Sequence, residues 1–427
     1  MGFQQGLSGL NGASKQLEVI GNNVANSNTV GFKQTIAEFA DVYANSLGAA
    51  GGSQIGIGTR VAATAQQFAQ GNVTTTSNNL DIAINGNGFY RMDSNGVISY
   101  SRNGQFQLDQ NGFITNAQGV KLTGYGVDTA GNIIAASPAP LQIPTTNLNP
   151  QSTSSIALGL NLDSRATVPA TATFSPNDST SFNNSTSMTI YDSLGNSHVA
   201  TLYFSKQAAV PAAVTTAAPS ATSAWNSYLT VDGNAVPAAN TAIGQLAFDS
   251  NGSQVYPVAA APLTAGQISV SVPLTNGATT PQAMVMDFST TSQYGSAFGV
   301  NQLTQNGYTS GQLSGFNTSA DGTIQGRYSN GQTKNLGQIV LANFSNPQGL
   351  LDQGNNLWVE TSTSGSPLVG APTTGSLGTL QSGAVESSNV DLTAELVNMI
   401  TAQRVYQANA QTIKTQDSVL QTLVNLR

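Results

Sequence analysis

The residue types that carry out most protein chemistry are almost absent from this sequence. Its 427 residues include a single histidine, His198, and no cysteine. Zinc and iron–sulfur sites need several Cys or His ligands, so neither is expected. A nucleophile activated by histidine would have to depend on His198 alone. Because His198 follows a turn at the edge of an expected strand, we interpret it as structural or solvated.

Three segments of the pattern Asp-x-Asn-Gly resemble the start of a calcium-binding loop. They begin at Asp93, Asp109 and Asp249. A calcium loop has Glu at its twelfth position, where these segments have Gly104, Val120 and Ala260. An Asp that opens a turn and a Gly that closes it are typical of hairpins, so we interpret the segments as turns.

Nucleotide-binding motifs are incomplete. The Gly-x-Gly pairs that begin at Gly86 and Gly124 lack the third glycine of a dinucleotide fingerprint, because Arg91 and Thr129 stand there. No Gly-Lys-Ser/Thr sequence is present, and no carboxylate pair stands out for glycoside hydrolysis. We therefore expect no enzyme activity, no cofactor, no bound metal and no small-molecule substrate.

The charge balance excludes further classes of partner. The chain has 13 Lys and Arg residues, a formal net charge of -7 and only 8% charged residues. Nucleic-acid and anionic-membrane binding require clustered basic residues, so neither is expected. No apolar stretch approaches the length of a membrane span, and the N-terminal residues lack the pattern of a cleavable signal peptide. Any export is expected to use another route.

Elements at the two ends of the chain could position an assembly surface. Near the N-terminus, apolar residues recur every seven positions at Phe3, Leu10, Leu17 and Val24. Leu7 and Ile20 extend the same side. This spacing predicts an amphipathic helix over roughly 3–26. The glycines and asparagines within it favour a low intrinsic helix stability.

A longer apolar repeat occupies the C-terminus. Its members at a spacing of seven are Leu392, Met399, Tyr406, Ile413 and Leu420. Leu396 and Val424 each follow a member of this series by four residues. Ser388 and Asp391 fit a capping box, so a helix over about 389–425 is predicted. A seven-residue period favours a coiled-coil seam, and the two terminal helices are natural partners. The simpler alternative is two ordinary surface helices on a globular core.

The region between the helices has the pattern of β structure. Short β-rich runs alternate with Asp-x-x-Gly turns that begin at Asp93, Asp109, Asp128, Asp192 and Asp249. We expect a mixed, mainly β fold in which a split β domain carries an inserted outer β domain. The expected parts are an N-terminal helix (1–30), a linker (31–70), the split β domain (71–147 and 305–380), the insert (148–304) and a C-terminal helix (386–427).

Several long motifs carry a resemblance to a known family. They are ANSNTVGFK at 25–33, NLDIAINGNGF at 79–89, YSRNGQF at 100–106, GVKLTGY at 119–125, and NVDLTAELVNMI at 389–400 with QANAQTIK at 407–414. In this order they resemble the bacterial flagellar rod and hook axial proteins. The first motif supplies the family residues Ala25, Asn26, Thr29, Gly31, Phe32 and Lys33. The insert, with YDSLGNSH at 191–198, is similar to that of the hook-type members.

The resemblance implies a structural subunit that polymerises with itself into a helical tube. The terminal helices would form an inner coiled-coil core around a channel, the split β domain a middle layer and the insert an outer layer. Such a tube, the hook, would be the universal joint that passes motor torque from the rod to the filament. The implied partners are the distal rod protein, the hook cap protein, the hook–filament junction protein, the hook-length control protein and the flagellar type III export apparatus. The implied location is the extracellular flagellum at the cell surface.

Two alternatives remain at this point. A distal rod protein of the basal body shares the ends and the split domain, but lacks a large central insert. A secreted β-rich adhesin would suit the middle of the chain, which is rich in Ala, Ser and Thr, but would not need matched heptads at both ends.

Overall fold

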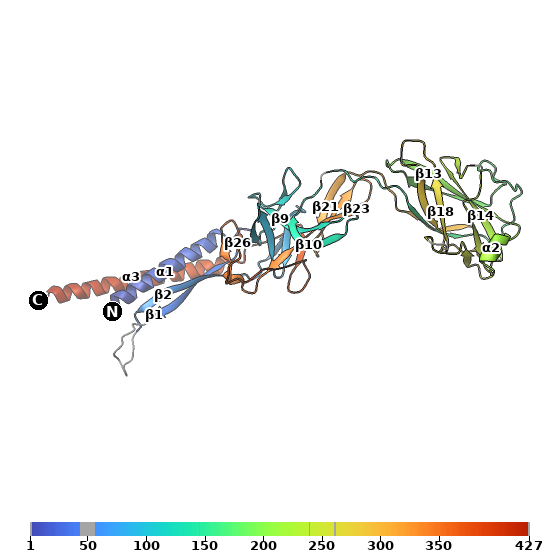
Figure 1. The fold of residues 1–427 in the computed structure, drawn as a ribbon. Helices are drawn as coiled ribbons and strands as arrows, with labels where there is room; N and C mark the ends of the chain where they lie inside the picture. Colours follow the sequence, from blue (N-terminus) through green and yellow to red (C-terminus); the bar gives the residue numbers. More distant parts are fainter. Residues whose placement is uncertain (1, 43–55, 145, 239, 260–261, 426–427) are drawn as a thin grey trace. The chain divides into compact units, whose positions relative to one another are not determined.

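The computed structural model describes residues 2–42, 56–144, 146–238, 240–259 and 262–425. The chain is mainly β, with one long helix at each end, which confirms the predicted fold class. It divides into two compact units. Unit 1 comprises 1–145, 314–327 and 333–427, and unit 2 comprises 146–313 and 328–332. Figure 1 follows the chain through both units.

Two long helices of unit 1 form close to where the heptads predict them. Helix α1 spans Gly2–Ala25 and helix α3 spans Leu392–Asn425. The N-cap of α3 is Asp391, whose Oδ1 accepts hydrogen bonds from the amides of Thr393 (2.9 Å) and Ala394 (3.1 Å). Strands β1 (Thr35–Val42) and β2 (Gly58–Gln66) form an antiparallel pair that contacts α1.

One large sheet of 13 strands forms the β body of unit 1. Its members are β5 (Phe89–Ser94), β6 (Val97–Ser101), β7 (Gln107–Leu108), β8 (Ile114–Thr115), β9 (Lys121–Val127), β10 (Ile133–Pro140), β21 (Leu313–Thr318), β22 (Thr323–Tyr328), β23 (Thr333–Ile339), β24 (Leu341–Asn343), β25 (Leu351–Asp352), β26 (Leu357–Val359) and β27 (Leu368–Gly370). A 3₁₀ turn at Pro347–Gly349 precedes β25. An aromatic core that includes Phe89, Tyr100 and Trp358 packs within this body.

Two small antiparallel pairs join the early and late parts of unit 1. Strand β3 (Val73–Thr75) pairs with β29 (Ala384–Glu386), and β4 (Ile82–Asn85) pairs with β28 (Thr379–Ser382). Chain segments about 300 residues apart in sequence therefore lie side by side just before α3 begins.

Unit 2 contains two sheets that share one apolar core. The first has β11 (Ser155–Asn161), β18 (Gln267–Val272), β19 (Gln282–Asp287) and β20 (Gly299–Gln305). The second has β12 (Asn184–Tyr191), β13 (Ser197–Lys206), β14 (Ser223–Val231), β15 (Asn234–Val236), β16 (Gly244–Phe248) and β17 (Gln254–Tyr256). A short helix, α2 (Ala212–Ala217), precedes β14. Trp225 of β14 is fully buried and belongs to the same core cluster as Leu158 and Met286 of the first sheet.

The Asp-x-x-Gly segments fold as the turns that the sequence predicts. Their closing glycines all have positive φ, between 78° at Gly252 and 92° at Gly96, a region that favours glycine. The opening carboxylate accepts backbone amides of its own turn. For example, Asp109 Oδ1 accepts bonds from the amides of Asn111 and Phe113, both at 2.8 Å.

Candidate assembly site: the paired terminal helices and their attachment

Glycines of α1 allow the two terminal helices to approach closely. A Cβ atom added at Gly6 would lie 3.0 Å from Ile413 Cγ1, and one added at Gly9 would lie 2.7 Å from Asn409 Oδ1. Near the other end of the pair, Asn23 contacts Glu395, so α1 and α3 are antiparallel (Figure 1). The glycines that weaken α1 as an isolated helix therefore serve the contact between the helices.

The predicted seam residues of α1 lie partly in this contact. Ile20 is buried, with 4% of its surface exposed, whereas Leu10, Leu17 and Val24 are half-buried. Phe3 and Leu7 near the start of the helix are exposed.

The predicted seam residues of α3 differ in how far they are buried. Met399 and Ile413 are half-buried, and the positions that accompany them against α1 are Glu395, Ala402 and Asn409. Leu392, Tyr406 and Leu420 are exposed although they lie on the same seven-residue line as Met399 and Ile413, and Leu396 is exposed as well. The side chain of Val424 lies outside the described residues.

Much of the apolar surface of α3 is thus uncovered within one chain. We call it the α3 stripe, and its members are Leu392, Leu396, Val397, Ile400, Val405, Tyr406, Val419 and Leu420, each between 38% and 59% exposed. Exposed apolar surface of this extent on one element is typical of an interaction site.

The family motif at 25–33 forms the turns that lead out of α1. The amide of Thr29 donates to the carbonyl oxygen of Asn26 (3.0 Å), and the amide of Phe32 donates to that of Thr29 (3.2 Å). Ala25 is exposed at the helix end. Gly31 has φ +72°, and a Cβ there would lie 2.6 Å from the Asn103 amide nitrogen. Only glycine fits this position without strain.

A buried charge cluster of Lys33, Arg102 and Glu386 ties this motif to the β body. Lys33 Nζ lies 2.6 Å from Glu386 Oε1, and Arg102 Nη1 lies 3.1 Å from Glu386 Oε2. The side chains of Lys33 and Glu386 are fully buried and that of Arg102 is 3% exposed. The three residues come from the end of the α1 motif, from the residue after β6, and from the end of β29.

Backbone groups add further hydrogen bonds to the cluster. Lys33 Nζ donates to the Ala69 carbonyl oxygen (2.8 Å), Arg102 Nη2 donates to that of Gly86 (2.9 Å), and the Gly71 amide donates to Glu386 Oε1 (2.8 Å). Burial lowers the pKa of Lys33 and that of Arg102, although the Glu386 charge opposes both shifts. Two cations therefore depend on one carboxylate, and the cluster fixes where the chain leaves the body toward both helices.

The sequence signal for this cluster was incomplete. Lys33 and Arg102 both lie in motifs that carry the family resemblance, whereas Glu386 lies outside them. The one available signal is general. Only 8% of the residues are charged, and any charged residue that is buried needs a partner of opposite charge.

Unit 2 places His198 in an ionic hydrogen-bonded cluster. Its Nδ1 lies 2.6 Å from Asp232 Oδ2 and its Nε2 lies 3.3 Å from Asp192 Oδ2. Asn276 Nδ2 also donates to Asp192 Oδ2 (2.6 Å). Burial alone would lower the pKa of His198, but the hydrogen bonds to Asp232 and Asp192 raise it above its ordinary value. The arrangement bridges three segments of unit 2, which agrees with a structural interpretation of His198.

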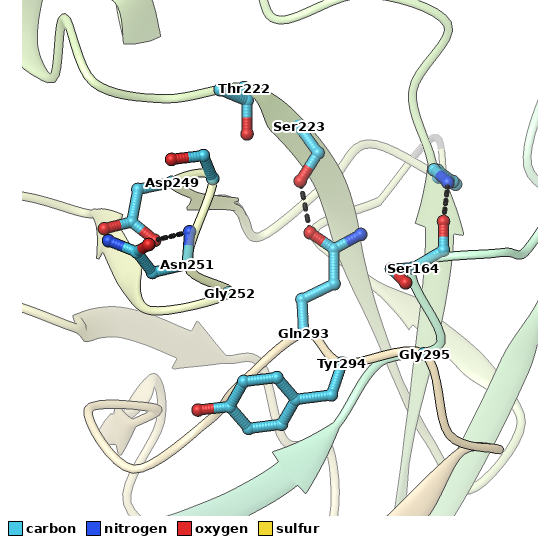
Figure 2. Close-up of a pocket in the computed structure, with 11 residues that line it drawn as sticks. Ser164, Thr222, Ser223, Asp249, Asn251, Gly252, Gln293, Tyr294 and Gly295 are labelled. Atoms are coloured by element: carbon cyan, nitrogen blue, oxygen red, sulfur yellow. Dashed lines mark hydrogen bonds between the residues drawn. The ribbon is translucent and has the colours of Figure 1, made fainter.

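An open polar cavity of about 380 Å³ lies elsewhere in unit 2 (Figure 2). Its charged groups are engaged by the backbone: Asp249 Oδ1 accepts the amides of Asn251 and Ser253, both at 2.9 Å, and Lys206 Nζ donates to the Ser164 carbonyl oxygen at 2.6 Å. Ser223 donates to Gln293 across the wall. Thr222 donates to the Phe248 carbonyl oxygen (3.2 Å), so neither of these two hydroxyls is hydrogen-bonded to a carboxylate or a histidine in the described part of the chain.

Other kinds of site are not evident within the described ranges. No group of three or more His, Cys, Asp or Glu side chains is arranged to hold a metal ion there. Within the same ranges, no helix combines the length and hydropathy needed to cross a membrane.

Family comparisons match most of the chain. Residues 3–33 match the flagella basal body rod protein family, 83–190 the flagellar hook protein FlgE/F/G D1 domain, 161–308 the flagellar basal body protein FlaE D2 domain, and 381–426 the flagellar basal body rod FlgEFG protein C-terminal family. Paired terminal segments around a split β body therefore define a flagellar axial protein.

Full-length relatives specify the family further. The chain is 44% identical to the flagellar hook protein FlgE of Salmonella typhimurium over 432 residues, and 43% identical to that of Escherichia coli over 430 residues, with 100% of each chain covered in both cases. The corresponding protein of Treponema pallidum is 31% identical, with 99% of this chain and 98% of that protein covered. The chain belongs to the family of flagellar hook proteins, which confirms the resemblance seen in its motifs.

A solved structure supports the fold. The crystal structure of Helicobacter pylori flagellar hook protein FlgE2 matches with a TM-score of 0.53 at 13% identity, over 73% of this chain and 100% of that chain. At this identity the match concerns the fold alone.

Proposed function

We propose that this chain polymerises into the tubular hook through contacts between copies along the α3 stripe. The uncovered apolar stripe is the observation that carries the proposal. Helix α1 covers the face of α3 that holds Ala402 and Asn409, and leaves the residues of the α3 stripe exposed. A helix of 34 residues is about 50 Å long, so several neighbouring copies could cover it. A head-to-tail contact that does not close generates a helical polymer.

In this proposal, the division of the chain follows the layers of the tube. Residues 1–30 and 386–427 form the inner core around a channel, 71–147 with 305–380 the middle layer, and 148–304 the outer layer, with 31–70 as the linker. The seam residues that the heptads predict, Met399 and Ile413 among them, act either between α1 and α3 or between copies. The six residues of the 25–33 motif fix the exit from α1.

The function is mechanical rather than catalytic, and the chain needs no cofactor for it. A hook bends while it rotates, so contacts between copies must exchange during each turn. Polar contacts contribute only about 0.5–1.5 kcal/mol each, and a chain with 8% charged residues offers many such contacts and few strong ion pairs. We therefore expect the β layers of neighbouring copies to slide between contacts of similar energy. The helical core remains the stiff, continuous element of the tube.

The partners follow from this position between the rod and the filament. We propose that the subunit travels through the type III export apparatus, adds beneath a hook cap protein on the distal rod protein, and later contacts a junction protein. A length-control protein ends growth. The final location is outside the cell.

Substitutions in the α3 stripe test polymerisation. Leu396→Asp and Leu420→Asp place a charge on side chains that are 44% and 54% exposed in the single chain, so the subunit should still fold. Burying an unpaired charge between copies is costly, so polymers should not form from either variant. Val97→Asp, at a residue of the β body that is 62% exposed, is the matched control and should polymerise. Electron microscopy and sedimentation measure the outcome, and normal polymers of both stripe variants would refute the proposal.

A further inference from the structure

A small cavity of about 140 Å³ lies where α1, the start of β1 and the first turns of α3 meet. Asn23 and Ile20 of α1, Gln34, and Glu395 and Asn398 of α3 line it. We call it the Glu395 cavity. All of its lining residues belong to unit 1.

One oxygen of Glu395 is buried there without a partner. Glu395 is 3% exposed, and its Oε1 accepts hydrogen bonds from Gln34 Nε2 (2.6 Å) and Asn23 Nδ2 (3.4 Å). Its Oε2 is buried and has no hydrogen-bond partner within the described part of the chain, and no ion pair involves this carboxylate there. A buried carboxylate held only by amides is costly, and a cation supplied from outside would compensate it.

Two of the basic side chains on the terminal helices could supply this cation from another copy. Lys15 of α1 pairs with Glu18 at 2.6 Å. Arg404 and Lys414 of α3 are exposed, and no ion pair involves them within the described residues. Arg404 lies four residues after Ile400 and seven after Val397, on the same side of α3 as these two members of the α3 stripe. A guanidinium is also more weakly hydrated than an ammonium and suits a desolvated ion pair better.

We propose that the Glu395 cavity receives the guanidinium of Arg404 from a second copy of the chain in the polymer. The inference rests on the proposed function. Within one chain the contact cannot form, because nine residues of helix place the two side chains on opposite faces and about 13 Å apart along the axis. The pair would link each copy to the next and would fix the register of the stripe contact, as buried polar pairs do in coiled coils.

A double-substitution cycle on polymer growth tests the pair. Purified full chain is seeded with fragments of its own polymer, and the subunit concentration left in solution at equilibrium is measured. Arg404→Gln and Glu395→Gln should each raise this concentration roughly tenfold or more, because truncating one partner of a buried ion pair leaves the other charge buried and unpaired. Arg404→Gln with Glu395→Gln together should raise it no further than the more severe single change. Lys414→Gln, the matched control, should change it less than about threefold.

Additive effects of the two substitutions, or an effect of Glu395→Gln without one of Arg404→Gln, would overturn the pairing. Cysteine cross-linking gives a second measurement, since the chain has no cysteine of its own. Glu395→Cys with Arg404→Cys should give disulfide-linked ladders in polymers and none in dilute subunits. Ladders from Glu395→Cys with Lys414→Cys instead would refute the assignment. If the unaltered chain fails to polymerise, the proposed function itself fails.

Discussion

Replacing Glu386 by Gln tests whether the buried charge cluster holds the ends of the chain to the β body. The substitution keeps the shape of the side chain but removes the only carboxylate that contacts Lys33 and Arg102 in the cluster. Two buried cations would then face each other without compensation. Removing one partner of such a buried pair costs about 3–5 kcal/mol, which corresponds to a decrease of roughly 1–2 M in the urea midpoint.

Tryptophan fluorescence can report this loss separately for unit 1. The chain has two tryptophans: Trp358 is buried in unit 1 and Trp225 in unit 2. In a Trp225→Phe background, Glu386→Gln should lower the urea midpoint of the Trp358 signal. Lys15→Gln removes an ion pair whose side chains are 61% and 59% exposed, so it should cost under about 1 kcal/mol. A Glu386→Gln effect no larger than that of Lys15→Gln would refute the reasoning.

Two further predictions concern His198 and Gly31. Because hydrogen bonds to two aspartates raise the pKa of His198 above 6.5 in the folded chain, its contribution to the stability of unit 2 is full below that pH and is lost as pH rises through the raised pKa. Urea midpoints of the Trp225 signal should therefore fall with rising pH, and His198→Gln should flatten that dependence; an unchanged profile would contradict the cluster. Gly31→Ala should cost about 2 kcal/mol or more because of its positive φ and the nearby Asn103. Gly21→Ala is the control, because a Cβ added there would meet no atom outside its own helix backbone within 4 Å in the described part of the chain. It should stabilise by roughly 0.5–1 kcal/mol, and equal effects of the two alanines would refute the role of Gly31.

Local patterns predicted the local structure of the chain well. The heptads predicted helices at 3–26 and 389–425, and the structure has them at Gly2–Ala25 and Leu392–Asn425. The Asp-x-x-Gly turns also form where they were predicted. Both signals depend on neighbouring residues, whose spacing determines which side of a helix is apolar or where φ becomes positive.

Pairing over long distances could not be predicted in the same way. The register of β4 with β28 joins Asn85 to Thr379, and nothing in either short strand specifies the other. The parallel pairing of β11 with β19 is a similar case. Strand pairing depends on the packing of the whole sheet rather than on local preference.

The assembly site shows the same limit. The apolar period identified α3 as a seam helix, but the glycines of α1 select the line with Ala402 and Asn409 as its intrachain contact. Lys33 and its partner Glu386 are 353 residues apart in sequence, and only the fold brings them together. Sequence period therefore predicts which surfaces are apolar, whereas the shape of the partner decides which of them are covered.

The most direct test of the central claim is where the protein lies on a cell that makes it. Immunogold electron microscopy on intact cells, with antibody against residues 148–304, would label the outer layer of the proposed polymer. We predict label confined to a short curved segment between the cell surface and the flagellar filament. Label that is seen only after the envelope is opened, or label spread over the whole cell surface, would contradict the account.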